Sequence, residues 1–213
     1  MRTRAAFPGF HDGRIPGNKD KTYPAEILTP DEVLAMLRLC GGGLTGVRDR
    51  ALITVMYRSG LRCAEALALQ PKDVDLRAGS ITVLHGKGDR RRTVGIDPGA
   101  TEIVEAWIER RQRDLAPPPG VVLFCSAKCR PLTNSAVRMT LRRLAAQAGI
   151  AKRVHPHGLR HTMAYELMME GVPVPYIQRQ LGHTSLATTD RYLNHIAPLD
   201  VISRIRERVW DPG

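Results

Sequence analysis

The stretch Ser80–Ile96, SITVLHGKGDRRRTVGI, changes the periodicity of this sequence. Both ends of the stretch are rich in β-branched residues, and its middle holds the glycine-flanked Lys87. This pattern predicts a β-hairpin with Lys87 in the turn. The segments on either side have helical spacing instead. The sequence therefore predicts the α+β class: a mostly helical domain with a small antiparallel β-sheet or hairpin.

Helix start signals appear on both sides of the hairpin. Thr29 and Glu32 stand at the spacing of a capping box, which predicts a helix start there. Asp97 and Thr133 are expected to cap two later helices. From His157 the spacing is helical to the end of the chain, with glycine and proline residues dividing it into short helices.

The composition indicates a polyanionic partner. The 213 residues include 32 Lys and Arg against 21 Asp and Glu, which gives a net charge of +11. No apolar run approaches the roughly 20 residues of a membrane span, and the basic N-terminus lacks the apolar core of an export signal. We therefore expect a cytoplasmic, nucleoid-associated protein that binds nucleic acid and no membrane.

The cysteines are expected to be reduced thiols, because an export signal is absent. They are Cys40, Cys63, Cys125 and Cys129. Cys125 and Cys129 have the same spacing as His157 and His161, which suggests a zinc site. However, the gap from Cys129 to His157 is far longer than the dozen or so residues of a zinc finger. We expect inert thiols, no metal and no cofactor.

Four separated segments hold residues suited to phosphate chemistry. Arg62 begins a predicted helix, Lys87 lies in the hairpin turn, and His157 and Arg160 fall one helical turn apart. The fourth segment, LGHTSLATTDRYLNH, ends with Tyr192 close behind a histidine. Each residue alone has an ordinary alternative: a solvated arginine, a turn lysine, surface or core histidines, and a packed tyrosine.

In this order the segments resemble the tyrosine recombinases, the phage-integrase-like family. GLRCAEALAL resembles the family's first box, GKGDRRR its hairpin, HGLRHTMA its HxLRH box and LGHTSLATTDRYLNH its nucleophile box. The resemblance begins near Ile27. We expect residues 1–25, which are rich in glycine, proline and basic residues, to be a flexible basic N-terminal arm. Residues 26–213 would be the catalytic domain, without the upstream core-binding domain that most members carry.

The resemblance implies a site-specific DNA recombinase or integrase that cleaves and rejoins DNA through a 3′-phosphotyrosyl intermediate, without metal or ATP. Tyr192 would attack the phosphodiester, His157 would accept its proton, and Lys87 would protonate the leaving 5′-oxygen. The implied catalytic residues are Arg62, Lys87, His157, Arg160, His183 and Tyr192.

The remaining implied roles concern the phosphate. Arg62 and Arg160 would bind the phosphoryl oxygens as negative charge develops on them. His183 would donate a hydrogen bond to the scissile phosphate. Glu65 lies one helical turn after Arg62 and would orient that arginine; an exposed first-turn glutamate is the alternative.

The implied partners are double-stranded DNA, further copies of the chain in a homo-oligomer (a tetramer) on DNA, and accessory DNA-binding proteins. Arginine-bearing segments are the candidates for DNA contacts, although a charged outer helix face is an alternative. These candidates are Arg90, Arg91, Arg92, Asn134, Arg138 and Arg142. The terminal stretch LDVISRIRERVW has apolar residues at helical spacing, for packing either on its own domain or on a neighbouring protomer.

Three alternative functions stay open on the sequence. Type IB topoisomerases and telomere resolvases use the same set of catalytic residues. The sequence does not distinguish the DNA products of these enzymes from those of a recombinase. An inactive DNA-binding relative would lack one of the active residues, yet each of them is present. A basic protein that binds RNA or a membrane surface would leave the His, Arg and Tyr residues unexplained.

Overall fold

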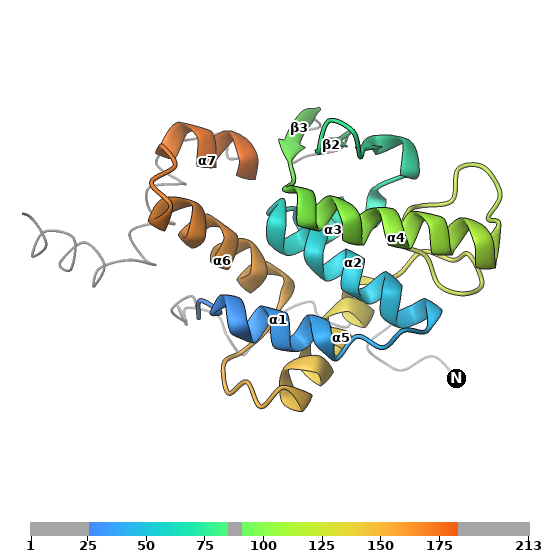
Figure 1. Cartoon of the computed structure of the whole chain (residues 1–213), viewed down its shortest axis with the longest axis horizontal. Coiled ribbons are helices and arrows are strands. Elements are labelled where there is room, and N and C mark those ends of the chain that lie inside the picture. Colours follow the sequence, from blue (N-terminus) through green and yellow to red (C-terminus); the bar gives the residue numbers. More distant parts are fainter. Residues whose placement is uncertain (1–25, 85–90, 183–213) are drawn as a thin grey trace, which may run out of the picture.

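The computed structural model describes residues 26–84 and 91–182, shown coloured in Figure 1. Several sequence predictions fall outside these ranges. They are the arm at 1–25, the terminal helix, and the residues Lys87, Arg90, His183 and Tyr192. Within the described ranges, no helix is long and apolar enough to cross a bilayer.

The described residues form seven α-helices and three short strands, which confirms the predicted mostly helical α+β class. The helices are α1 (Pro30–Arg38), α2 (Leu44–Arg58), α3 (Cys63–Ala68), α4 (Pro98–Leu115), α5 (Asn134–Gln147), α6 (Pro156–Met169) and α7 (Val174–Leu181). A short 3-10 turn, Pro71–Asp73, follows α3.

The predicted helix caps are confirmed. The Thr29 hydroxyl accepts from the Glu32 amide at 3.2 Å, and the Glu32 carboxylate accepts from the Thr29 amide at 2.7 Å. Asp97 caps α4 and Thr133 caps α5 in the same manner. Each cap satisfies an amide that the first helical turn would leave without an acceptor, so these helices begin where the sequence predicted.

The sheet has three antiparallel strands in the order β1 (Val74–Asp75), β2 (Ser80–Val83) and β3 (Arg92–Gly95). Strands β2 and β3 pair with Ile81 opposite Val94, and both of these side chains are buried. The two predicted strands of the hairpin are therefore confirmed. Strand β1 was not predicted, because two residues are too short to show an alternating pattern. Strand β3 lies at the edge of the sheet.

Helix α2 is the centre of the core. It packs against α4 and α6, with α1 and α5 below it in the view of Figure 1. All its residues from 51 to 57 are buried. Trp107 of α4 is fully buried, and its indole N–H donates to the Leu123 carbonyl at 3.0 Å. This bond lets the largest core side chain be buried without an unsatisfied donor.

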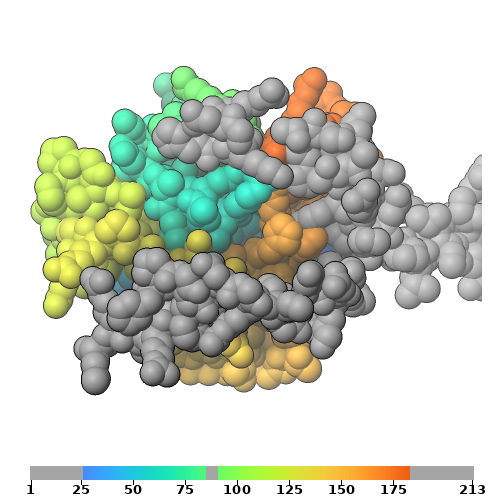
Figure 2. Space-filling model, turned by 180° about the vertical axis from the view of Figure 1, so that it is seen from behind, coloured from blue at the N-terminus to red at the C-terminus, as the bar shows by residue number. Residues whose placement is uncertain are grey.

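A smaller apolar cluster joins α6 to α7. Its buried residues are Met163, Ala164, Ile177 and Leu181. On the face shown in Figure 2, the residues around α3 (teal) lie between the loop after α4 (yellow) and α6–α7 (orange). Helix α7 also contacts β3. Segments from three distant parts of the sequence therefore meet beside α3.

Candidate active site

A broad groove of about 1010 Å³ lies between α3, α5 and the start of α6. Five arginines and two histidines line it, and none of the described residues along it is acidic. They are Arg62, Arg138, Arg142, Arg153, Arg160, His155 and His157. Such a concentration of positive charge in a concave surface attracts a polyanion.

Arg62 enters the groove from the N-cap position of α3, where Glu65 fixes it. The Arg62 amide donates to one Glu65 oxygen at 2.9 Å, and its guanidinium Nη1 donates to the other at 2.8 Å. The Glu65 side chain is only 4% exposed, whereas that of Arg62 is 30% exposed. Glu65 is therefore a buried anchor and not an exposed first-turn glutamate.

The same carboxylate holds a second arginine from the sheet. Arg92, the first residue of β3, donates from Nη1 and Nη2 to the two Glu65 oxygens at 3.0 and 2.8 Å. Burial alone would raise the pKa of Glu65. The hydrogen bonds from Arg92 and Arg62 outweigh burial and lower that pKa to about 2. The sequence placed Arg92 among the DNA contacts, but its guanidinium has an internal partner, while Arg91 is exposed.

The start of α6 presents histidines to the groove. His155 is the N-cap, and its Nδ1 accepts from the Gly158 amide at 2.7 Å. His157 follows in the first turn and meets His161 edge to face, with ring centroids 4.4 Å apart. Although the His157 side chain is exposed to the groove, protein atoms crowd around it. Desolvation, followed by the charges of Arg160, His155 and Arg62, lowers the pKa of His157.

Arg160 lies one turn beyond His157 and is fully buried where it lines the groove. Its Nη1 donates to the Gly60 carbonyl and its Nη2 to the Leu181 carbonyl, both at 2.5 Å. Each of these nitrogens carries a second N–H. Arg160 thus joins the loop before Arg62 to the end of α7.

Arg62, His157 and Arg160 therefore line one basic groove. Residues 26–197 match the phage integrase family. The chain belongs to the phage integrase family. The resemblance that rested on four short segments is thereby confirmed.

Tyrosine recombinases are among the relatives of this chain. A tyrosine recombinase XerC of Xanthomonas campestris pv. campestris (strain B100) is 35% identical over 167 residues, which cover 78% of this chain and 50% of the XerC. The chain thus spans about half the length of that relative. A crystal structure of XerA recombinase superposes with a TM-score of 0.77 at 29% identity, covering 94% of this chain and 73% of XerA.

A DNA-bound member has the same fold. The XerH site-specific recombinase, solved in a post-cleavage complex with its palindromic difH substrate, superposes with a TM-score of 0.72 at 28% identity. The match covers 87% of this chain and 54% of XerH. The family fold seen here is thus one that engages DNA in XerH.

The groove of this integrase-family chain extends along α5. Asn134, Arg138 and Arg142 lie one turn apart on that helix, are exposed and line the groove. These are the residues that the sequence selected as DNA contacts on α5. Arg153 lines the groove too and was missed. It lies in the irregular segment between α5 and α6, where periodicity assigns no face; the basic pair at 152–153 was the available signal.

Four predicted site residues of this family member lie outside the described residues: Lys87, Arg90, His183 and Tyr192. Gly182, which precedes His183, ends α7 in the left-handed conformation with φ 65°. A Cβ at Gly182 would lie 2.5 Å from Nε of Arg92. Glycine is required there both by the backbone and by the approach of Arg92.

The described residues contain no group of three or more His, Cys, Asp or Glu side chains that could hold a metal ion. The four cysteines are free thiols, and Cys63 lies in the groove beside Arg62. The positively charged side chains that line the groove are its five arginines.

Proposed function

We propose that this chain is a site-specific tyrosine recombinase that cleaves and rejoins double-stranded DNA through a 3′-phosphotyrosyl intermediate. One observation carries the proposal. Arg62 lines the same groove as His157 and Arg160, which are far from it in the sequence, and none of the described residues of that groove is acidic. That the curated relatives are tyrosine recombinases supports it.

In the proposed reaction the Tyr192 oxygen attacks phosphorus, and the bond from phosphorus to the 5′-oxygen breaks. The phenolic proton passes to His157, and Lys87 gives a proton to the departing 5′-oxygen. A 5′-hydroxyl later attacks the phosphotyrosyl bond and releases Tyr192. One ester replaces another in each step, so religation needs no ATP.

The described groups suit these roles. A base must be neutral before it accepts a proton, and the lowered pKa of His157 keeps it neutral near pH 7. Arg62 and Arg160 would stabilise the negative charge that develops on the phosphoryl oxygens, while Glu65 holds Arg62 in place. Guanidinium groups would supply the charge that Mg²⁺ supplies in other phosphoryl transfers, so we propose that no metal is required.

DNA binding would extend the same groove. Asn134, Arg138 and Arg142 on α5 would contact the duplex, together with Arg90 and Arg91, which precede β3 in the sequence. Recombination joins two duplexes, each cut on both strands. We therefore propose a homo-oligomer, a tetramer, on DNA, with accessory DNA-binding proteins among its partners.

Covalent trapping on DNA tests this function. The full chain is incubated, with excess EDTA, with a random library of nicked duplexes, and the SDS-resistant protein–DNA adducts are isolated and sequenced. We expect adducts from the wild type and none from Tyr192→Phe, with DNA binding kept. Tyr176→Phe is the matched control, because Tyr176 is an exposed tyrosine on α7.

Four outcomes would count against the proposal. An absence of adducts from the wild type refutes the activity. An adduct that persists in Tyr192→Phe moves the nucleophile to another tyrosine. Cleavage that needs Mg²⁺ refutes the metal-independent mechanism. Relaxation of a supercoiled plasmid without exchange between two sites would indicate a topoisomerase instead of a recombinase.

A further inference from the structure

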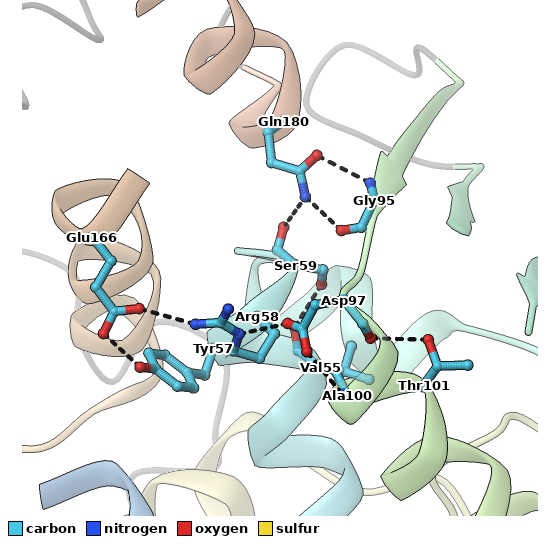
Figure 3. A network of polar contacts seen from close by, with 10 residues as sticks. All are labelled: Val55, Tyr57, Arg58, Ser59, Gly95, Asp97, Ala100, Thr101, Glu166 and Gln180. Carbon is cyan, nitrogen blue, oxygen red and sulfur yellow. Dashed lines mark hydrogen bonds and ion pairs between the residues drawn. The ribbon is translucent and has the colours of Figure 1, made fainter. Parts of the chain in front are cut away.

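The open edge of β3 is covered by a side chain. The Gly95 amide donates to Oε1 of Gln180 at 3.0 Å, and Nε2 of Gln180 donates to the Gly95 carbonyl at 2.8 Å. Figure 3 shows the Gln180 side chain reaching from α7 to this strand. The carboxamide makes the pair of bonds that a peptide group of a further strand would make. Both ends of the amide are used, so its orientation is fixed.

The same amide nitrogen makes a third bond. Nε2 of Gln180 donates to the Ser59 carbonyl at 3.2 Å. Ser59 is the C-cap of α2 and is fully buried. One half-buried side chain therefore ties together the end of α2, the edge of β3 and the end of α7.

These bonds fall beside the two carbonyls that hold Arg160. The guanidinium of Arg160 donates to Gly60, the residue after Ser59, and to Leu181, the residue after Gln180. The bond between Gln180 and Ser59 thus spans the same two chain segments as Arg160 does. A change in this bond would therefore be expected to alter the separation of the two carbonyls that hold the guanidinium.

Other contacts make the frame around Gln180 rigid but do not reach α7. Arg58 at the end of α2 bonds Asp97, just after β3, at 2.6 Å and Glu166 of α6 at 3.1 Å. Tyr57 donates to the same Glu166 at 2.5 Å. Figure 3 shows this chain of contacts running from α6 through α2 to the start of α4.

Helix α7 itself is attached to α6 by an apolar cluster that includes Leu181. Apolar contacts are non-directional and tolerate sliding, whereas hydrogen bonds specify position. Together with the Arg160 bond to the Leu181 carbonyl, the bonds of Gln180 are therefore the directional contacts described here that position α7 against the end of α2 and the edge of β3.

We propose that Gln180 is a positioning residue for the cleavage reaction, because its bonds to Ser59 and Gly95 align the carbonyls on which the Arg160 guanidinium rests. The inference rests on the proposed recombinase function. A displacement of about 1 Å in a group that stabilises a transition state can slow a reaction roughly a hundredfold.

The test compares Gln180→Met, which keeps the length of the side chain and removes its three bonds, with Gln112→Met on the exposed surface of α4. The probe is a nicked duplex recovered in the covalent trapping. It is prepared in two forms: with the ordinary phosphodiester, and with a methylphosphonate at the scissile position. The methylphosphonate lacks one charged oxygen, so a misplaced guanidinium costs less on it. Single-turnover adduct formation and DNA affinity are measured for both forms.

We expect Gln180→Met to slow adduct formation about 10- to 100-fold on the phosphodiester and less than about threefold on the methylphosphonate, with unchanged affinity. Gln112→Met should match the wild type on both. Equal slowing on the two forms would assign Gln180 a general structural role and overturn the proposal, as would an unchanged rate on the phosphodiester.

A DNA-free measurement separates this inference from the proposed function. Hydrogen exchange of the Gly95 amide should be faster in Gln180→Met, because the amide loses its acceptor. Unchanged exchange would overturn the inference even if the wild type cleaves DNA. If the wild type forms no adduct, the proposed function fails and the inference fails with it. Should Gln180→Met not fold, Gln180→Leu, which also lacks the acceptor and both donors, takes its place in both measurements.

Discussion

Replacing Glu65 with glutamine should destabilise the chain strongly at neutral pH and less at acidic pH. The carboxylate accepts four hydrogen bonds, two from Arg62 and two from Arg92. Its side chain is 4% exposed, so solvent does little to screen these contacts. Glutamine has nearly the same shape. It removes the charge and turns one acceptor into a donor that faces a guanidinium.

The magnitude follows from the pKa of Glu65, which the protein lowers from 4.5 to about 2. This difference corresponds to about 3 kcal/mol of unfolding free energy at pH 7. Because the pKa is lower in the folded state, the stabilisation is complete above pH 4.5 and is lost as the pH falls towards 2. At about pH 3, less than half of it should remain.

Urea unfolding followed by circular dichroism measures both values. Wild type and Glu65→Gln are compared at pH 7 and pH 3, with Asp114→Asn as the control. Asp114 also accepts from two arginines, but on the surface, so its replacement should change stability little. The reasoning would be refuted by a Glu65→Gln variant as stable as the wild type at pH 7. A stability difference of the same size at both pH values would refute it too.

Three further predictions concern other parts of the site. Asp97→Ala removes the α4 cap and the partner of Arg58, so thermal unfolding should show a loss of about 1 kcal/mol or more from the cap; an unchanged melting temperature would contradict it. The rate of adduct formation should fall in acid with a midpoint below pH 6.5, because His157 must be neutral to act as a base and its pKa is lowered. Single-turnover rates measured between about pH 5 and 8 would show this fall in rate at acidic pH, and a rate that does not change with pH would exclude His157 as the base. The double variant Arg138→Gln/Arg142→Gln should reduce the slope of log affinity against log salt by about 2; an unchanged slope in DNA-binding titrations would mean that α5 makes no phosphate contacts.

The sequence predicted the elements whose signals are local. Thr29, Asp97 and Thr133 cap helices because their side chains bond amides only three residues away. The hairpin strands alternate clearly enough to be recognised. Strand β1 could not be recognised, because its two residues become a strand only by pairing with β2.

The site could be predicted only in part, because some of its residues lie in recognisable short segments and others depend on long-range contacts. Resemblance to family boxes identified Arg62, His157 and Arg160, and the fold brings them to one groove. The pairing of Arg92 with Glu65 could not be predicted, because the two residues are 27 positions apart and only the folded chain brings them together. Gln180 carries no local signal at all, since its partners lie 85 and 121 positions away.

Because Arg160 is buried and hydrogen-bonded within the protein, its presence in the HxLRH box is not by itself evidence of catalytic activity. Removing this side chain would leave the Gly60 and Leu181 carbonyls without their donor, at a cost of about 1–3 kcal/mol for each buried group. Lysine could not replace it, because a single ammonium lacks the planar fork that reaches two carbonyls at once. Natural selection for folding alone would therefore retain Arg160. A descendant of this chain that no longer cut DNA would still carry the arginine of the HxLRH box.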